Sequence, residues 1–399
     1  MGTLSVFLDV PLAPSTDIPL DAYKADPSSL KVCLGHADTD EVWIPPVVKR
    51  ILLQIPEDPT LNHEYLPELG ILEFTTAAMK LVIGKESRAA GIQTIGGTGA
   101  VWTGAEFLHR WYKPSNCTPT TVLLAEHHLE NLGCIFQVAG FTDIRTYRYW
   151  NPERLTRQNQ CNAFSFLPLG LCRFLQERHL FPFFDVPAQG LASGNLDRDA
   201  WAVRHFVDRG FEILCAQSFS RIFGLYDERI GNLIVVTKNN QTLIKILSQL
   251  AKQISVTWLG PTSLGARVIS MVLTSPALLY EWKQSLKALV KRIMLVREKL
   301  KEKLRILGTP GSWEHLTAQS GVYSFIGLLP SQVEFLAKEK HIYLLSNGQI
   351  NICSINAKNL DYVAQSIHEA IMSTSHQDQS VTVRIYSSPT HVSKSESFY

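Results

Sequence analysis

The sequence predicts an α/β fold, in which helices flank a β-sheet. Short apolar runs typical of buried strands lie at residues 122–124, 181–184, 213–216 and 233–237, and helical patterns alternate with them. The chain has 399 residues, of which 45% are hydrophobic, so it is long enough to build two or three domains with large cores.

The first hundred residues contain three helical patterns. Residues 11–40 are rich in proline and polar residues, and helices are expected at 47–54 and 69–83. A third helix is expected to begin at Gly96-Gly97-Thr98-Gly99 and to continue to Trp111. The sheet is expected to lie among these helices.

The strongest helical pattern covers residues 289–307. Apolar residues recur there at steps of three and four, at Leu289, Ile293, Val296, Leu300, Leu304 and Leu307. Gly308 follows as a C-cap candidate. A long two-faced helix of this kind can connect two domains, whereas the polar residues 376–399 are expected to form a disordered tail.

Composition excludes several classes of function. The formal net charge is +2, from 38 basic and 36 acidic residues, which gives no basis for binding nucleic acid or an anionic membrane surface. The beginning of the chain lacks the pattern of a signal peptide, and no apolar run approaches the roughly 18 residues of a membrane span. Seven widely spaced cysteines favour a reducing compartment. A cytoplasmic protein is therefore expected.

No metal site is expected. His127 and His128 are adjacent, and neighbouring side chains point to different sides of a helix or strand, so the two rarely share one metal ion. Hydrolase chemistry of the serine type is also not indicated, because the chain has no Gly-x-Ser-x-Gly motif.

Several segments together resemble the cytosolic aspartate aminotransferase family over roughly residues 3–372. They are Leu61-Asn62-His63-Glu64-Tyr65-Leu66-Pro67, the loop at Gly96, Phe181-Pro182-Phe183-Phe184-Asp185, Gly190-Leu191-Ala192-Ser193-Gly194-Asn195-Leu196, the run Cys215–Tyr226, Gly231-Asn232 and His341-Ile342-Tyr343-Leu344-Leu345. An isolated Gly-Gly-Thr-Gly would be weak evidence, but the set is long and specific.

The resemblance implies fold type I of the enzymes that use pyridoxal phosphate. It implies a large domain at residues 43–288, with a mixed, mostly parallel sheet flanked by helices. It also implies a smaller α/β domain at 13–42 and 289–375, and an N-terminal arm at 1–12. A homodimer is expected, and a heterodimer with an active relative is the alternative.

The resemblance also assigns cofactor positions, most of which this chain keeps. Gly97, Thr98, Ser218, Ser220 and Arg229 match residues that hold the phosphate group, and Tyr65 matches a tyrosine that reaches it from the partner subunit. Asp185 matches the aspartate that pairs with the pyridine nitrogen, which lets the ring accept electrons. Pyridoxal phosphate is therefore the expected cofactor.

Arg221 stands where the family has the lysine that forms a Schiff base with the cofactor. That lysine must lose its proton to bond the cofactor and to move the substrate's proton. A guanidinium has a pKa above about 12 and in practice keeps its proton. We therefore expect Arg221 to be inactive in this role, and any bound cofactor to be held without a covalent bond.

The substrate positions have diverged as well. Gln349 and Ser255 replace the two arginines that take the substrate's carboxylates, the second of them from the partner subunit. Ala188 replaces a tyrosine beside the cofactor's phenolic oxygen, and Leu129 replaces a tryptophan that stacks on its ring. A bidentate arginine–carboxylate pair cannot be reproduced by glutamine or serine.

Two stretches are shorter than in the family. The glycine-rich loop that covers the substrate is reduced to residues 36–40, and the region between Trp150 and Phe181 lacks the family's His-Asn-Pro-Thr-Gly segment. Residues 163–169 are candidates to replace part of the lost strand, although Pro168 cannot donate a hydrogen bond in a sheet.

Three functional hypotheses follow. The first is an aspartate aminotransferase-like protein with little or no transaminase activity, a pseudoenzyme that keeps part of the cofactor pocket. The second is an active aminotransferase or racemase with another amino acid as substrate, which would need a different lysine; Lys238 and Lys245 are the nearest candidates downstream. The third is a product whose fold is compromised by the deletion.

Overall fold

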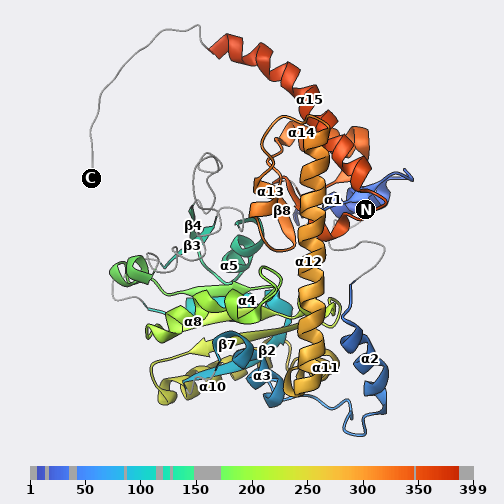
Figure 1. Cartoon of the computed structure of the whole chain (residues 1–399). Coiled ribbons are helices and arrows are strands. Elements are labelled where there is room, and N and C mark those ends of the chain that lie inside the picture. The colour runs from blue at the N-terminus through green and yellow to red at the C-terminus, as the bar shows by residue number, and fades with distance from the viewer. Residues whose placement is uncertain are drawn as a thin grey trace, which may run out of the picture. The chain divides into compact units, whose positions relative to one another are not determined.

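Helices and strands alternate through the described part of the chain, which confirms the α/β class. The computed structural model describes residues 7–13, 18–35, 43–84, 88–113, 120–125, 129–147, 172–345 and 347–385 (Figure 1). The chain divides into a larger unit, residues 41–295 with 318–322, and a smaller unit, residues 1–40, 296–317 and 323–399. The boundary between residues 295 and 296 falls within helix α12 (Pro276–Ile306).

The larger unit is built on a mixed four-stranded sheet. Its strand order is β2 (Ala89–Ile95), β7 (Ile230–Val236), β6 (Ile213–Ser218) and β5 (Phe183–Val186). Strand β7 runs antiparallel to both of its neighbours, whereas β5 and β6 are parallel. A separate parallel pair is formed by β3 (Thr121–Ala125) and β4 (Asp143–Tyr147).

The strands β6 and β7 are buried on both faces. Leu214, Ala216, Leu233 and Val235 belong to one core cluster, and the residues between them, such as Ile234, belong to a second cluster. This double burial explains why both strands are nearly continuous apolar runs in the sequence. Strand β5 begins at Phe183, two residues later than the predicted start, because Pro182 has no N–H for a sheet hydrogen bond.

Two groups of helices cover these faces. The first cluster packs against α4 (Gly96–Trp111), α5 (Cys134–Val138) and α10 (Asn240–Thr257), and the second against α3 (Leu72–Ile83) and α8 (Trp201–Asp208). Other helical segments among the described residues of this unit are α2 (Pro46–Gln54), the 3₁₀ turn Ile55–Glu57, the π-helical turn Leu129–Gly133, residues 172–177, α7 (Leu196–Asp199), α9 (Ser220–Phe223) and α11 (Leu264–Thr274).

Helix α12 is longer than the sequence pattern predicts. It begins at Pro276 rather than near residue 289, and its first turns carry Tyr280, Trp282 and Ser285 in place of a regular aliphatic repeat. Gly308 ends the helix as predicted, with a φ of 68°. The Thr309 N–H donates to the Leu304 carbonyl at 3.0 Å, which is the wrap-around bond of a glycine C-cap.

The smaller unit contains two short strand pairs and several helices. Strand β1 (Val32–Cys33) pairs in parallel with β9 (Ile342–Tyr343), and β8 (Tyr323–Phe325) pairs antiparallel with β10 (Gln349–Asn351). Its helical segments are α1 (Ile18–Ala25), α13 (His315–Ala318), α14 (Pro330–Lys340), the 3₁₀ turn Ile352–Ser354 and α15 (Leu360–Ile385).

The core of the smaller unit contains a buried arginine. Arg297 donates hydrogen bonds to the carbonyls of Leu316 and Tyr323, each at 2.8 Å, and to the Ser324 hydroxyl at 3.0 Å. Burial lowers the pKa of Arg297 to about 10, so the side chain keeps its charge at neutral pH. It therefore ties α12 to the segment around α13 and β8.

Some expectations fall on residues outside this description. They include the shortened loop at 36–40, the pair His127-His128 and most of the shortened region, residues 148–171. Helix α15 continues to Ile385, so part of the segment expected to be a disordered tail is helical, and residues 386–399 are not described.

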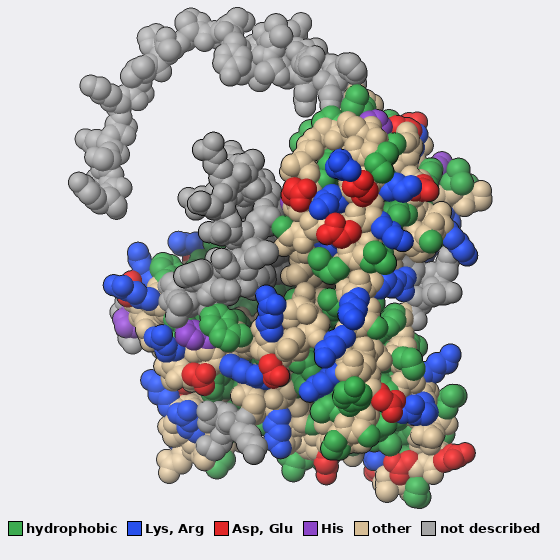
Figure 2. All heavy atoms as spheres, in the orientation of Figure 1, with side chains coloured by type: hydrophobic (Ala, Val, Ile, Leu, Met, Phe, Trp, Pro, Cys, Tyr) green, Lys and Arg blue, Asp and Glu red, His purple; other side chains and the backbone are tan. Residues whose placement is uncertain are grey.

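The surface carries charges of both signs. Basic and acidic side chains are interspersed over the face drawn in Figure 2, in keeping with the formal net charge of +2. In the described part of the chain, no helix combines the length and the apolar character that crossing a membrane requires.

Candidate functional site

Several of the predicted site residues lie close together where β5 and β6 end. The two strands are parallel, and Asp185 pairs with Ala216 in their register. Strand β6 ends at Ser218, and α9 begins two residues later with Ser220 and Arg221. Because the carboxyl ends of parallel neighbours lie at one edge of a sheet, Asp185 and Arg221 occupy the same edge.

The start of α4 lies at the same edge, next to the first residue of β7. Strand β2 runs directly into α4, and its last residue, Ile95, pairs with Ile230. The Gly96 N–H donates to the Arg229 carbonyl at 2.6 Å, and the Thr94 hydroxyl donates to the Gly96 carbonyl at 3.0 Å. These bonds fix the turn between β2 and α4 against β7.

Two glycines let this turn approach its neighbours closely. A Cβ added to Gly97 would lie 2.8 Å from the Ser218 Cβ, and one added to Gly96 would lie 2.9 Å from an Arg229 guanidinium nitrogen. Gly96 also has a φ of 68°, which favours glycine. The sequence therefore places Ser218 and the Arg229 guanidinium beside the first turn of α4.

Arg229 has an uncommon backbone conformation. Its φ is 52°, in the left-handed region that costs a non-glycine residue free energy and that recurs at functional sites. Its side chain is exposed but lies against Gly96, where a helix leaves its first N–H groups without helical acceptors. Together with the Ser218 hydroxyl, these donors are of the kind that hold phosphate groups in proteins.

The carboxyl of Asp185 has a perturbed pKa. Burial raises the pKa of Asp185 to about 6, and the positive charge of Arg221 opposes that rise without cancelling it. The Asp185 side chain is exposed in β5, although protein atoms crowd its carboxyl group. Cys215, one strand away, is fully buried, and burial together with the charge of Asp185 raises the pKa of its thiol.

Aromatic packing anchors the short helix that carries Arg221. Phe223 stacks on Trp282 with ring centroids 4.7 Å apart, and Phe219 packs edge-on against Phe74 at 5.3 Å. The Trp282 indole N–H donates to the Ile222 carbonyl at 2.8 Å. Residues on both sides of Arg221 are therefore fixed in the core, while Arg221 itself is half-buried.

A buried polar pair supports the ends of β6 and β7. The Asn232 amide donates to the Gln217 side-chain oxygen at 2.7 Å, and the Gln217 amide donates to the Ala78 carbonyl of α3 at 3.0 Å. Gly231 lies beside them, and a Cβ there would come within 2.1 Å of the Gly96 carbonyl oxygen. Gly231-Asn232 is one of the segments that resemble the family, and the structure shows that it supports the turn at Gly96.

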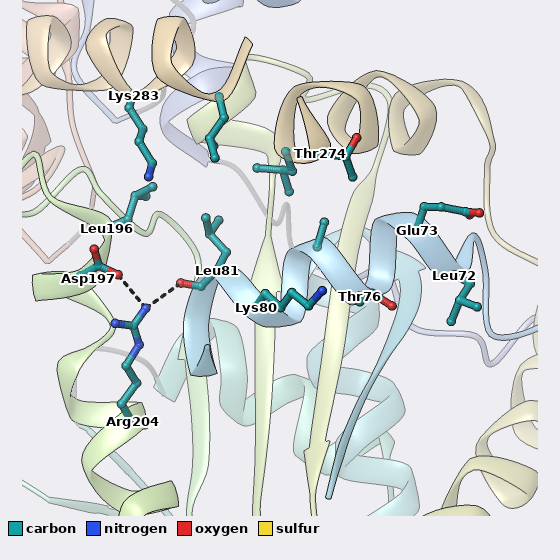
Figure 3. A pocket seen from close by; sticks show the side chains of 13 residues that line it. Leu72, Glu73, Thr76, Lys80, Leu81, Leu196, Asp197, Arg204, Thr274 and Lys283 are labelled. Atoms are coloured by element: carbon teal, nitrogen blue, oxygen red, sulfur yellow. Dashed lines mark hydrogen bonds and ion pairs between the residues drawn. The ribbon is translucent and has the colours of Figure 1, made fainter. Parts of the chain in front are cut away.

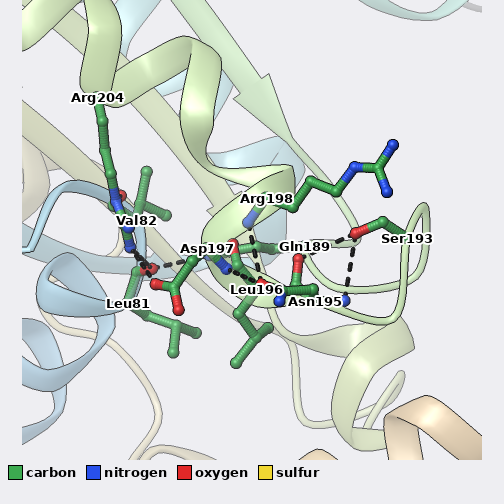
Figure 4. A network of polar contacts seen from close by, with 9 residues as sticks. All are labelled: Leu81, Val82, Gln189, Ser193, Asn195, Leu196, Asp197, Arg198 and Arg204. Carbon is green, nitrogen blue, oxygen red and sulfur yellow. Dashed lines mark hydrogen bonds and ion pairs between the residues drawn. The ribbon is translucent and has the colours of Figure 1, made fainter. Parts of the chain in front are cut away.

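A second polar network holds the segment that follows Asp185 (Figure 4). The Gln189 amide donates to the carbonyls of Leu81 and Leu196, at 2.8 and 3.0 Å. The Asn195 side chain caps α7 by accepting from the N–H groups of Asp197 and Arg198. These bonds connect the chain after β5 to the end of α3.

The comparisons with known proteins agree on one family. The family model for class I and II aminotransferases matches residues 170–367. The chain is 45% identical over 405 residues to the cytoplasmic aspartate aminotransferase of Gallus gallus, which covers 92% of this chain and 98% of that protein. This chain belongs to the aspartate aminotransferase family.

Solved structures show the same fold. The cytoplasmic aspartate aminotransferase of Saccharomyces cerevisiae superposes with a TM-score of 0.85 at 28% identity, over 92% of this chain and 99% of that one. An aromatic-amino-acid aminotransferase from Burkholderia pseudomallei, solved covalently bound to pyridoxal phosphate, gives a TM-score of 0.83 at 29% identity, over 92% and 100%. The expected α/β architecture of the family is thereby confirmed.

In this member of the family, the remaining site residues predicted from the sequence lie in several different elements. Tyr65 is 81% exposed in the irregular segment before α3, and Thr98 is exposed in the first turn of α4. Ser255 is exposed near the end of α10, and Leu129 is exposed at the start of the π-helical turn. Gln349 begins β10 and belongs to the smaller unit.

The two lysines considered as substitutes do not meet Arg221 in the fold. Lys238 lies two residues after Val236, where β7 ends, and its N–H donates to the Glu212 side chain, at the strand end opposite Arg229. Lys245 is exposed within α10. Strand β7 spans seven residues, or about 20 Å, so Lys238 lies far from the edge that carries Arg221.

A separate groove of about 650 Å³ lies on the larger unit (Figure 3). Residues of α3, α7, α8, α11 and α12 line it, and none of the predicted site residues is among them. Arg204 there donates to Asp197 at 2.9 Å and to the Leu81 carbonyl at 3.3 Å. The groove is therefore distinct from the edge where Asp185 and Arg221 lie.

Proposed function

We propose that this protein binds pyridoxal phosphate without a covalent bond and has little or no transaminase activity. The observation that carries the proposal is the placement of Arg221. It is held in the first turn of α9, at the same sheet edge as Asp185 and the start of α4. A guanidinium there keeps its proton, so it can neither bond the cofactor nor accept a proton from a substrate.

The residues at this edge fit the phosphate group and the ring nitrogen of the cofactor. Gly96 lies close to Arg229, and Gly97 lies close to Ser218. Hydrogen-bond donors therefore line a space that a Cβ at either glycine would fill. In our proposal Gly97, Thr98, Ser218, Ser220 and Arg229 hold the phosphate, and Asp185 holds the ring N–H. When bound, pyridoxal phosphate supplies an electron sink for the carbon next to an amine.

The substrate positions support the same proposal. In our reading Gln349 and Ser255 stand where the family binds the carboxylates of aspartate and 2-oxoglutarate, and neither side chain carries a positive charge. Ala188 offers no hydroxyl for the cofactor's phenolic oxygen. Losing the lysine alone removes both a covalent step and a proton transfer, which together are worth several orders of magnitude in rate.

A dimer is part of the proposal. Tyr65 and Ser255 are both exposed, and in our proposal they face the site of a partner subunit. Sedimentation of the purified chain, alone and mixed with an active relative, distinguishes a homodimer from a heterodimer. We also propose a cytoplasmic location, in line with the name of the chicken relative.

The test combines borohydride reduction with mass spectrometry. We expect the protein to retain pyridoxal phosphate in native mass spectra and to show no lysine adduct after reduction and peptide mapping. Arg229→Gln should weaken retention, whereas Arg198→Gln, at an exposed arginine of α7, should leave it unchanged. A specific lysine adduct would favour an active enzyme with a new nucleophile, and loss of all retention would refute the cofactor site.

A further inference from the structure

We propose that Arg221 binds a carboxylate of the ligand, so that the pocket selects pyridoxyl phosphates that carry an amino-acid carboxylate over those that lack one. This inference rests on the proposed function, because it assumes that the phosphate and the ring bind as proposed there. It assigns Arg221 a positive role in recognition rather than only the loss of a lysine.

The first argument is geometric. Arg221 lies three residues after Ser218, whose Cβ would meet a Cβ on Gly97 at the start of α4. It shares the carboxyl edge of β5 and β6 with Asp185. The turn that carries Arg221 therefore lies in the same small region as the phosphate donors and the carboxyl proposed to take the ring nitrogen.

The second argument concerns charge. The Asp185 carboxylate and the Arg221 guanidinium interact electrostatically. A protonated ring nitrogen bound to Asp185 would place a second positive charge near Arg221. A carboxylate on the ligand would offset the repulsion between these two cations.

The third argument is the chemistry of the side chain. A guanidinium presents five N–H donors in a planar fork, which matches the two oxygens of a carboxylate. Lysine at this position would supply a single ammonium group that can react with the cofactor, whereas arginine supplies a fixed cation that cannot. The pocket that loses the covalent bond thereby gains a group suited to bidentate recognition.

Titration calorimetry with two matched ligands tests the inference. Phosphopyridoxyl-glycine carries a carboxylate, and phosphopyridoxyl-ethanolamine has a hydroxymethyl group in its place. We expect the glycine compound to bind at least about tenfold more tightly, the usual scale of one charged bidentate contact. The preference should fall to about onefold in Arg221→Gln and persist in Arg198→Gln.

The outcomes separate this inference from the proposed function. If the two compounds bind the unaltered protein with dissociation constants within about twofold of each other, Arg221 does not recognise the carboxylate and the inference is wrong. The proposed cofactor site is not affected by that result. If the preference persists in Arg221→Gln, another residue binds the carboxylate and the inference is wrong. If neither compound binds, the cofactor site and the inference fail together.

Discussion

Asp185 and Arg221 interact electrostatically at the carboxyl edge of β5 and β6, and burial of the Asp185 carboxyl outweighs the charge of the arginine. The pKa of Asp185 is about 6, against an ordinary value of 3.8. The fold therefore penalises the ionised carboxylate, although a cation lies nearby. A carboxyl whose ionised form the fold disfavours is more typical of a ligand-binding site than of a group that stabilises the fold.

This relationship predicts a pH-dependent gain in stability for Asp185→Asn. Because the pKa is higher in the folded state, stability is lost as the pH rises from about 4 through about 6. The neutral asparagine avoids that loss. After discounting for solvent exposure, we expect a gain of about 1 kcal/mol or less at pH 8, and a smaller gain at pH 5.

Urea unfolding of protein freed of cofactor, at both pH values, measures this difference. Asp227→Asn, which removes an exposed carboxyl from the loop before β7, is the matched control for the loss of one aspartate. An equal gain at pH 5 and pH 8 would mean that the carboxyl is not perturbed as described.

The close approach of Gly97 to Ser218 predicts that Gly97→Ala damages the start of α4. The added Cβ would lie 2.8 Å from the Ser218 Cβ, so the turn or the strand end must move. We expect a loss of about 1–3 kcal/mol in stability and weaker retention of pyridoxal phosphate.

Gly99→Ala is the control for this experiment, because it lies in the same first turn. Its added Cβ would meet nothing closer than 3.5 Å, which is an ordinary contact. Since alanine is a better helix former than glycine, we expect unchanged or slightly higher stability. Equal damage by both substitutions would show that the contact with Ser218 does not decide the result.

The sequence predicted the helix that begins at the carboxyl edge of β5 and β6 better than the strand β2 that supports it. The helix at Gly96–Trp111 has the predicted bounds, because glycines at its start and a regular apolar face mark it. Strand β2 was missed, since Gly91, Gln93 and Thr94 interrupt its apolar pattern. Yet Gln93 and Thr94 are fully buried, and the Gln93 side chain hydrogen-bonds Ile71 and Thr262.

The candidate site shows the same limit. Local motifs identify Ser218 and Arg221, because both lie in the run Cys215–Tyr226, and Arg229 lies between that run and Gly231-Asn232. Gly96 lies against Arg229, and Gly231 lies against Gly96, although these residues are more than 100 positions apart in the sequence. Such contacts can be recognised only once β2 is known to pair with β7, and periodicity in the sequence does not reveal that pairing.

Arg297 provides a prediction for the smaller unit. Its side chain is fully buried and donates to two carbonyls and one hydroxyl, so Arg297→Ala would leave buried acceptors unpaired and a cavity beside them. We expect a loss of about 3–5 kcal/mol, measured by urea unfolding. Arg305→Ala, in the same helix, removes only an exposed pair with Glu302 and should cost far less stability. Similar losses for the two variants would contradict the structural role of Arg297.

The last prediction concerns the identity of residue 221. If the rest of the cofactor site is intact, Arg221→Lys should restore a covalent adduct with pyridoxal phosphate at that position, detected by borohydride reduction and peptide mapping. The reason is that a lysine there supplies an amine that can react with the cofactor's aldehyde, whereas a guanidinium cannot. Arg198→Lys should form no specific adduct.

Restoring the lysine should not restore rapid transamination. Gln349 and Ser255 would still lack the positive charges that we propose the family uses for its dicarboxylic substrates, and Ala188 would still lack a hydroxyl. We therefore expect turnover of aspartate with 2-oxoglutarate to stay at least about a hundredfold below that of an active relative, since charged bidentate contacts are worth about 1.5–3 kcal/mol each. Turnover at the level of a relative would show that Arg221 alone accounts for the lost activity, and absence of the adduct would place the defect in the cofactor site itself.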